Sequence, residues 1–128
     1  MTVHIIEIQR RFSDMDFMRH VNNAVYGDYL QEARIRLNRI HRAAGHRVPS
    51  QVIARQEIDY VRPLHLKDEP VVVELWVEAV GRSSYTMQQR IRDDEGWLSA
   101  KARTVIVAID KASERSRVLP EEFRAFLI

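Results

Sequence analysis

Two carboxylates, a histidine and two asparagines crowd a ten-residue stretch of the sequence, immediately before a helical pattern: Asp14, Asp16, His20, Asn22 and Asn23. The start of a helix offers free backbone N–H groups and the positive end of the helix dipole. Such a helix start could stabilise the oxyanion that develops on a carbonyl group under attack. A carboxylate beside it could attack that carbonyl itself or activate a water molecule to do so.

The spacing of these residues resembles the signature of a known enzyme family. The pattern D-x-D-x-x-x-H-V-N-N-x-x-Y resembles that of hotdog-fold thioesterases of the 4-hydroxybenzoyl-CoA thioesterase type, and it is formed here by Asp14, Asp16, His20, Val21, Asn22, Asn23 and Tyr26. The segments E-I-D-Y-V-R-P-L (57–64) and V-G-R-S-S (80–84) also resemble this family. The sequence departs from the family pattern at Lys67, where many members have a glycine before the aspartate that is Asp68 here. The resemblance implies an acyl-CoA thioesterase.

The resemblance implies that Asp16 is the catalytic carboxylate, because the family carries it at the second Asp of D-x-D. The ordinary use of an aspartate before a helix is local capping, but Asn22 and Asn23 can already cap this helix. Asp16 would act as a nucleophile or as a general base toward water, and the sequence does not choose between the two. Asp14 is expected to have a structural role in the loop.

Asn23 and His20 complete the predicted catalytic set. The backbone N–H of Asn23 would be among the first free donors of the helix and would face the thioester oxygen. His20 either positions water or the acyl carbonyl, as the resemblance suggests, or is an ordinary loop residue. The five histidines are dispersed and the chain has no cysteine, so no metal site is expected. The thioester hydrolysis that the resemblance implies requires no cofactor.

A second group of residues is expected to bind the substrate. Tyr26, one turn into the helix, would border the acyl pocket, whereas Tyr29 is expected to pack in the core. Arginine grips phosphate through paired hydrogen bonds, which serine hydroxyls can complete. The candidates for the nucleotide end of coenzyme A are therefore Arg62, Arg82, Ser83 and Ser84, and Tyr60 is a further pocket residue.

The periodicity of the chain predicts which elements carry these residues. Apolar residues at spacings of three and four predict a helix over 23–44, with Arg34 on another, polar face. Alternating or β-branched segments predict strands, and Pro120 followed by two glutamates predicts a short terminal helix. The predicted strands are 3–12, 51–62, 71–80, 85–92 and 97–110. The pattern gives an α+β fold with an antiparallel meander; the resemblance specifies the hotdog fold, a long central helix wrapped by a five-stranded antiparallel sheet.

Length and composition narrow the remaining possibilities. The 128 residues are expected to form one domain, 1–128. The net charge of +2 with scattered arginines argues against nucleic acid as a partner. No apolar run approaches the roughly 20 residues of a membrane span, and the N-terminus reads as a strand instead of a signal peptide. A cytoplasmic location is therefore expected.

The expected partner is an acyl-CoA or acyl carrier protein thioester, and the expected assembly is a homodimer or homotetramer joined at exposed sheet edges. The pocket would then lie between subunits, with Tyr60, Arg62 or His65 contributed across the interface. Two alternative functions remain open. One is a non-catalytic hotdog module that binds acyl groups. The other is an enoyl-CoA hydratase, although its D-x-x-x-x-H spacing is one residue longer than Asp16 to His20 and its asparagine is missing at Met18.

Overall fold

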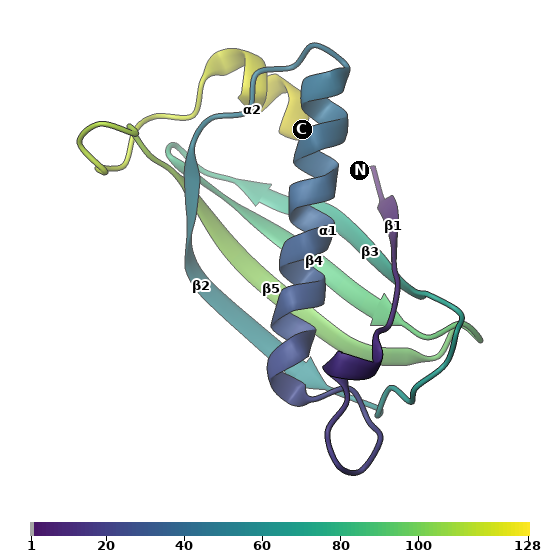
Figure 1. Cartoon of the computed structure of the whole chain (residues 1–128). Coiled ribbons are helices and arrows are strands. Elements are labelled where there is room, and N and C mark those ends of the chain that lie inside the picture. The colour runs from purple at the N-terminus through teal and green to yellow at the C-terminus, as the bar shows by residue number, and fades with distance from the viewer. Residues whose placement is uncertain (1) are drawn as a thin grey trace.

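One long helix lies along one face of an antiparallel sheet (Figure 1). The computed structural model describes residues 2–128, which leaves Met1 of the predicted domain outside the description. The sheet has five strands in the order β1-β3-β4-β5-β2, all antiparallel. The elements in chain order are β1 (His4–Ile8), a 3-10 turn (Phe12–Asp14), α1 (Asn23–Ala43), β2 (Gln51–Tyr60), β3 (Val71–Val80), β4 (Ser84–Arg92), β5 (Leu98–Ala108) and α2 (Glu121–Leu127).

These elements confirm the predicted α+β fold and its order of elements. The largest difference is in the first strand, which was predicted to reach residue 12 but leaves the sheet after Ile8. Arg10 is buried there and donates hydrogen bonds to the carbonyls of His65 and Glu69. The chain therefore turns away from β3 and starts the loop that carries Asp14 and Asp16.

Helix α1 begins and ends where its capping residues require. The Asn22 side chain accepts a hydrogen bond from the Ala24 N–H at 2.9 Å, as an N-cap should. At the other end Gly45 has a φ of +92°, the left-handed conformation that favours glycine after a helix.

The buried face of α1 differs from the predicted one toward its C-terminus. The helix buries Tyr26, Tyr29, Leu30, Ala33, Arg34, Leu37 and His41. At 3.6 residues per turn, the line through Ala33 and Leu37 continues to position 41 and leaves position 40 to one side. Ile40, predicted to be in the apolar stripe, is accordingly 55% exposed. Arg34, predicted to be on a polar face, is buried.

The core lies between α1 and the alternate residues of β3, β4 and β5. Val73 and Leu75 of β3, Ile91 of β4, and Ala100 and Ala102 of β5 are all buried. Small side chains on β5 let the helix approach the sheet closely.

Strand β2 is exceptional because it is exposed or half-buried along its whole length. The alternation along 51–62 places Val52 and Ile58 in the same parity of this strand. Ile58 is half-buried, but Val52 is exposed. β2 is the last strand of the sheet, and within residues 2–128 no element covers it as α1 covers the central strands.

Neither helix in the described part of the chain combines the length and the apolar character needed to cross a bilayer.

Candidate active site

The loop before α1 is a tight hairpin. Asp16 N–H donates to the His20 carbonyl at 2.9 Å, and Arg19 N–H donates to the Asp16 carbonyl at 3.0 Å. Arg19 has a φ of +61°, a conformation uncommon for a residue other than glycine. The Val21 N–H then donates to the Leu64 carbonyl at 2.8 Å, which attaches the loop to the segment after β2. The loop is therefore fixed at the N-terminal end of α1 (Figure 1).

The two carboxylate oxygens of Asp16 have different surroundings. Its Oδ1 accepts hydrogen bonds from the backbone N–H groups of Met18 at 2.9 Å and His20 at 3.3 Å. Its Oδ2 has no hydrogen-bond partner among residues 2–128. One oxygen thus holds the hairpin, which is the ordinary structural use of an aspartate in such a loop. The other oxygen is available for chemistry.

The start of α1 leaves one backbone donor available. The Ala24 N–H is taken by the Asn22 side chain, and the Val25 N–H donates to the Asn22 carbonyl at 2.8 Å. The Asn23 N–H is the first of the helix and has no acceptor within the described residues. This is the donor that the sequence predicted for an oxyanion.

Asp16 and Asn23 line the same cleft, which has a volume of about 210 Å³. Its walls are Asp16, His20, Val21, Asn23, Tyr26, Tyr60, Val61, Arg62 and Pro63. Most of the site residues that the sequence singled out therefore lie together, although they come from two segments far apart in the chain. The expectation that Tyr60 and Arg62 reach the pocket from a second subunit differs from this arrangement, because the same chain already supplies them.

Two tyrosines form one side of this cleft. The Tyr26 and Tyr60 rings meet edge to face, with centroids 5.2 Å apart. The Tyr26 hydroxyl accepts a hydrogen bond from the Leu64 N–H at 3.2 Å, and the Tyr60 hydroxyl donates to the Asn23 carbonyl at 3.2 Å. Burial, with smaller effects of Tyr60 and the Asp16 carboxylate, raises the pKa of Tyr26, so its hydroxyl stays neutral.

Arg62 and His20 are held by aromatic neighbours. The Arg62 guanidinium lies over the Trp97 ring, 4.6 Å from its centroid. The rings of His20 and His65 meet edge to face at 4.8 Å. No sequence signal indicated Trp97, since it lies far from Arg62 in the chain and only the pairing of β5 with β2 brings the two together.

Comparison with known proteins identifies the family. Residues 10–127 match the model of the thioesterase-like superfamily. The chain belongs to the thioesterase-like superfamily. The prediction of a hotdog-fold thioesterase, made from the D-x-D-x-x-x-H-V-N-N motif, is thereby confirmed at the level of the family and of the fold.

Individual thioesterases resemble the chain over nearly its whole length. A thioesterase from Thermus thermophilus, solved with coenzyme A and Zn, is 35% identical; the match covers 96% of this chain and 90% of that one, with a TM-score of 0.81. A Xanthomonas campestris protein proposed to be an acyl-CoA thioesterase is 36% identical, covering 91% and 98%, with a TM-score of 0.76. The long-chain acyl-CoA thioesterase FadM of Escherichia coli (strain K12) is 28% identical over 92% of each chain.

In this member of the thioesterase-like superfamily, Asp14 is placed for a structural role. It is 3% exposed and accepts hydrogen bonds from the Tyr29 hydroxyl at 2.6 Å and the Arg11 N–H at 3.0 Å. The Arg11 guanidinium also reaches it at 3.0 Å. Burial by itself would raise the pKa of Asp14, but the hydrogen bonds from Tyr29 and Arg11 outweigh it and leave that pKa lowered. Asp14 is therefore ionised, buried and fully engaged.

The residues of the V-G-R-S-S segment lie far from the cleft. On β5, Ser84 pairs with Val107 whereas Tyr60 pairs with Ala100. About seven residues of a strand separate the two pairings, which is about 23 Å. The carbonyls of Arg82 and Ser83 accept hydrogen bonds from Leu119 and Ala108, at the end of the sheet near α2 (Figure 1). Within one chain, Arg82, Ser83 and Ser84 do not join Asp16, and their role in binding coenzyme A stays a prediction.

Proposed function

We propose that this protein hydrolyses the thioester bond of acyl-CoA, with Asp16 as the nucleophile or general base and the Asn23 N–H as the oxyanion donor. Membership of the thioesterase-like superfamily makes the protein a thioester hydrolase. One observation supports the assignment of roles. Asp16, whose Oδ2 has no hydrogen-bond partner, and Asn23, whose N–H has no acceptor among residues 2–128, line the same small cleft.

The reaction needs only groups that this cleft contains, together with water. In the general-base route, Asp16 takes a proton from a water molecule whose oxygen attacks the thioester carbon. The carbonyl oxygen becomes an oxyanion and accepts a hydrogen bond from Asn23. Collapse of this intermediate breaks the C–S bond, and the proton held by Asp16 returns to the leaving sulfur. A carboxylic acid and a thiol are formed.

In the nucleophilic route, a carboxylate oxygen of Asp16 attacks the thioester carbon and expels the thiolate, which leaves an acyl anhydride on the enzyme. Water then hydrolyses this anhydride and restores the carboxylate. Both routes place the developing negative charge at the start of α1 and neither consumes a cofactor.

The choice of coenzyme A as the carrier rests on the relatives and on Arg62. One relative is an acyl-CoA thioesterase and another was solved with coenzyme A. Arg62 lies at the cleft with its guanidinium exposed, where it can bind a phosphate oxygen as the substrate enters.

The direct test is release of free thiol from a panel of acyl-CoA substrates by the wild type and by Asp16→Asn. Asparagine keeps an oxygen for the Met18 and His20 N–H groups but removes the charge, so kcat/KM should fall about 10²- to 10⁴-fold while the fold is preserved. Asp28→Asn, an exposed position on α1, is the matched control and should keep full activity. Hydration without thiol release would favour the hydratase, and binding without turnover would favour the acyl-binding module.

A dimer formed through β2 would pair this exposed edge of the sheet with the same edge of a second copy. β2 is a ten-residue edge strand with exposed apolar side chains at Val52 and Ile53, and such an edge invites pairing with a second chain. Antiparallel pairing of two β2 strands would bring the 81–84 turn of a second copy toward the end of the sheet that holds Asp16. A monomeric mass in solution, measured by light scattering, would contradict this assembly.

A further inference from the structure

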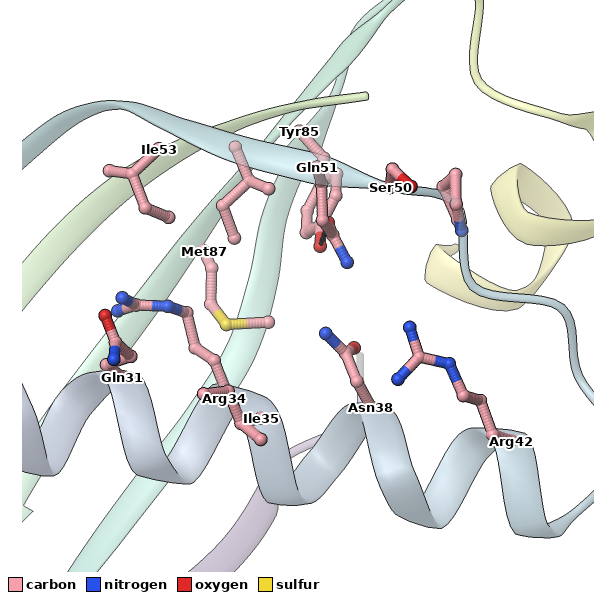
Figure 2. Close-up of a pocket in the computed structure, with 12 residues that line it drawn as sticks. Gln31, Arg34, Ile35, Asn38, Arg42, Ser50, Gln51, Ile53, Tyr85 and Met87 are labelled. Carbon is pink, nitrogen blue, oxygen red and sulfur yellow. Dashed lines mark hydrogen bonds between the residues drawn. The ribbon is translucent and has the colours of Figure 1, made fainter. Parts of the chain in front are cut away.

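A second cavity, of about 320 Å³, lies between α1 and β2, toward the C-terminal end of the helix. Gln31, Arg34, Asn38 and Arg42 project into it from α1, as Figure 2 shows. The opposite side is formed by the first residues of β2 and by side chains of β4 and β5, among them Gln51, Ile53, Tyr85, Met87 and Ile106. The proposed hydrolysis makes no use of this cavity.

Arg34 is the unusual residue here, because it is a buried cation without an acidic partner. Only 9% of it is exposed. Its Nη1 donates to the amide oxygens of Gln89 at 2.8 Å and Gln56 at 3.1 Å. Gln89 is fixed in turn by a hydrogen bond from its Nε2 to the Leu30 carbonyl. No acceptor for Nε or Nη2 of Arg34 is found among residues 2–128.

The other strongly buried arginine, Arg10, has the acidic partner that Arg34 lacks in the described part of the chain. Arg10 is also buried, but its guanidinium forms an ion pair with Asp94 at 2.9 Å. Burying an unpaired charge is costly, and burial does lower the pKa of Arg34. An anion bound in the cavity would supply the acidic partner that Arg34 lacks within residues 2–128.

The charges of the residues that line the cavity also favour an anionic ligand. Arg42 also lines it, at the exposed end, and no aspartate or glutamate is among the lining residues. Within the described chain neither Arg34 nor Arg42 takes part in an ion pair. Ile35, Ile53, Met87 and Ile106 add apolar surface beside the two cations. A ligand that matches this lining would carry an anionic group attached to an apolar chain.

We propose that the cavity between α1 and β2 binds a carboxylate through Arg34, and that this carboxylate is the far end of the acyl group of a dicarboxylic acyl thioester. Arg34 comes about eleven residues after Asn23 on α1, which is about 16 Å along the helix. The cleft is lined by the first turn of α1 and the end of β2, and the cavity by later turns of α1 and the start of β2, so both lie along the boundary between these two elements. A medium-length acyl chain that extends from the thioester can place its second carboxylate there. The assignment of the acyl group rests on the proposed function, whereas the carboxylate site does not.

The first experiment measures binding alone, by calorimetry, with dodecanedioate as the probe. The protein carries Asp16→Asn in every sample. We expect Arg34→Met to weaken binding at least tenfold, because a hydrogen-bonded charge pair is lost. Arg39→Met, an exposed arginine on the same helix, is the control and should bind as before. Equal binding to Arg34→Met, or equally tight binding of dodecanediol, would overturn the carboxylate site.

Arg42→Glu keeps the test valid if Arg34→Met fails to fold. Position 42 is exposed, so the fold should tolerate the change, while a negative charge at the cavity should repel dodecanedioate. At least tenfold weaker binding is expected, and unchanged binding would overturn the proposal.

The second experiment asks whether the carboxylate belongs to the acyl group. We expect wild-type kcat/KM to be higher for dodecanedioyl-CoA than for dodecanoyl-CoA, and Arg34→Met to reduce this ratio about 10- to 100-fold. An equal loss on both substrates would overturn the specificity role. Binding of dodecanedioate without any preference in hydrolysis would assign the site to a free carboxylic acid and reject the acyl group as its source. If the wild type released thiol from no acyl-CoA of the panel, the proposed function would fail and the binding experiment would still decide the site, whereas activity on other acyl-CoAs but not on dodecanedioyl-CoA would overturn only the acyl assignment.

Discussion

The Tyr29 hydroxyl donates a hydrogen bond to Asp14 Oδ2 at 2.6 Å, and both groups are buried. Tyr29 lies in the second turn of α1, and Asp14 precedes the hairpin that carries Asp16. The backbone carbonyl of Asp14 also accepts the Asn22 N–H at 2.9 Å. Asp14 therefore connects the loop that carries Asp16 to the helix whose first N–H is the proposed oxyanion donor.

Tyr29→Phe should destabilise the protein and impair catalysis together. It removes one hydrogen bond to a buried carboxylate, so the free energy of unfolding in urea should fall by about 1–3 kcal/mol. Because the loop loses an attachment to α1, kcat should fall as well. Tyr60→Phe removes a hydrogen bond at an exposed position and should cost less stability. Equal losses of stability in the two variants would contradict the importance of the Asp14–Tyr29 bond.

Asn23→Pro should reduce activity selectively. Proline has no N–H, is well accepted at the first position of a helix, and requires an extended residue before it. Asn22 meets this requirement, with φ −59° and ψ +136°. We expect kcat to fall about 10²- to 10³-fold, as for the loss of one oxyanion donor, with an unchanged circular dichroism spectrum.

Asn23→Ala is the matched control for this prediction, because it retains the backbone N–H. It should be close to wild type in kcat. A loss in Asn23→Ala as large as that in Asn23→Pro would show that the side chain, and not the amide, is the working group.

Arg62→Met and Arg82→Met should differ in their effect on coenzyme A recognition. Arg62 lies at the cleft, so its loss should raise KM for acyl-CoA about tenfold and have little effect on a short acyl thioester that lacks the nucleotide. Arg82→Met should have a comparable effect only in a dimer that brings the partner's turn to the cleft. Equal losses on both substrates by Arg62→Met would exclude a phosphate-binding role.

His41 should make the protein less stable in mild acid. Burial, with smaller effects of His4 and His46, lowers the pKa of His41 from 6.5 to about 4. Between these values the unfolded chain binds a proton that the folded protein does not, so stability falls as the pH drops from about 6.5 to 4 and is level above that window. The loss should approach about 3 kcal/mol, because the shift is about 2.5 pKa units at 1.36 kcal/mol per unit. Urea unfolding of wild type and His41→Leu across this range should show a smaller pH dependence in the variant.

The sequence by itself determined to a large extent the end of the molecule that holds the proposed active site. Asp16 and Asn23 are close together in the chain, and a hairpin that leads into a capped helix is a local structure. The asparagine cap, the helical period and the family resemblance therefore sufficed to predict a carboxylate beside a helix start. The strands followed from β-branched and alternating residues in the same local way.

Tertiary structure alone decided what depends on neighbours distant in the chain. Trp97 meets Arg62 only because β5 pairs with β2, and the 81–84 turn is separated from Asp16 by the length of the sheet. Arg34 is charged, so the sequence placed it on a polar face of the helix. The sheet nevertheless buries it, because burial depends on where the helix crosses the strands. Periodicity records which residues share a face, but burial is set by what lies opposite that face, and no local pattern specifies it.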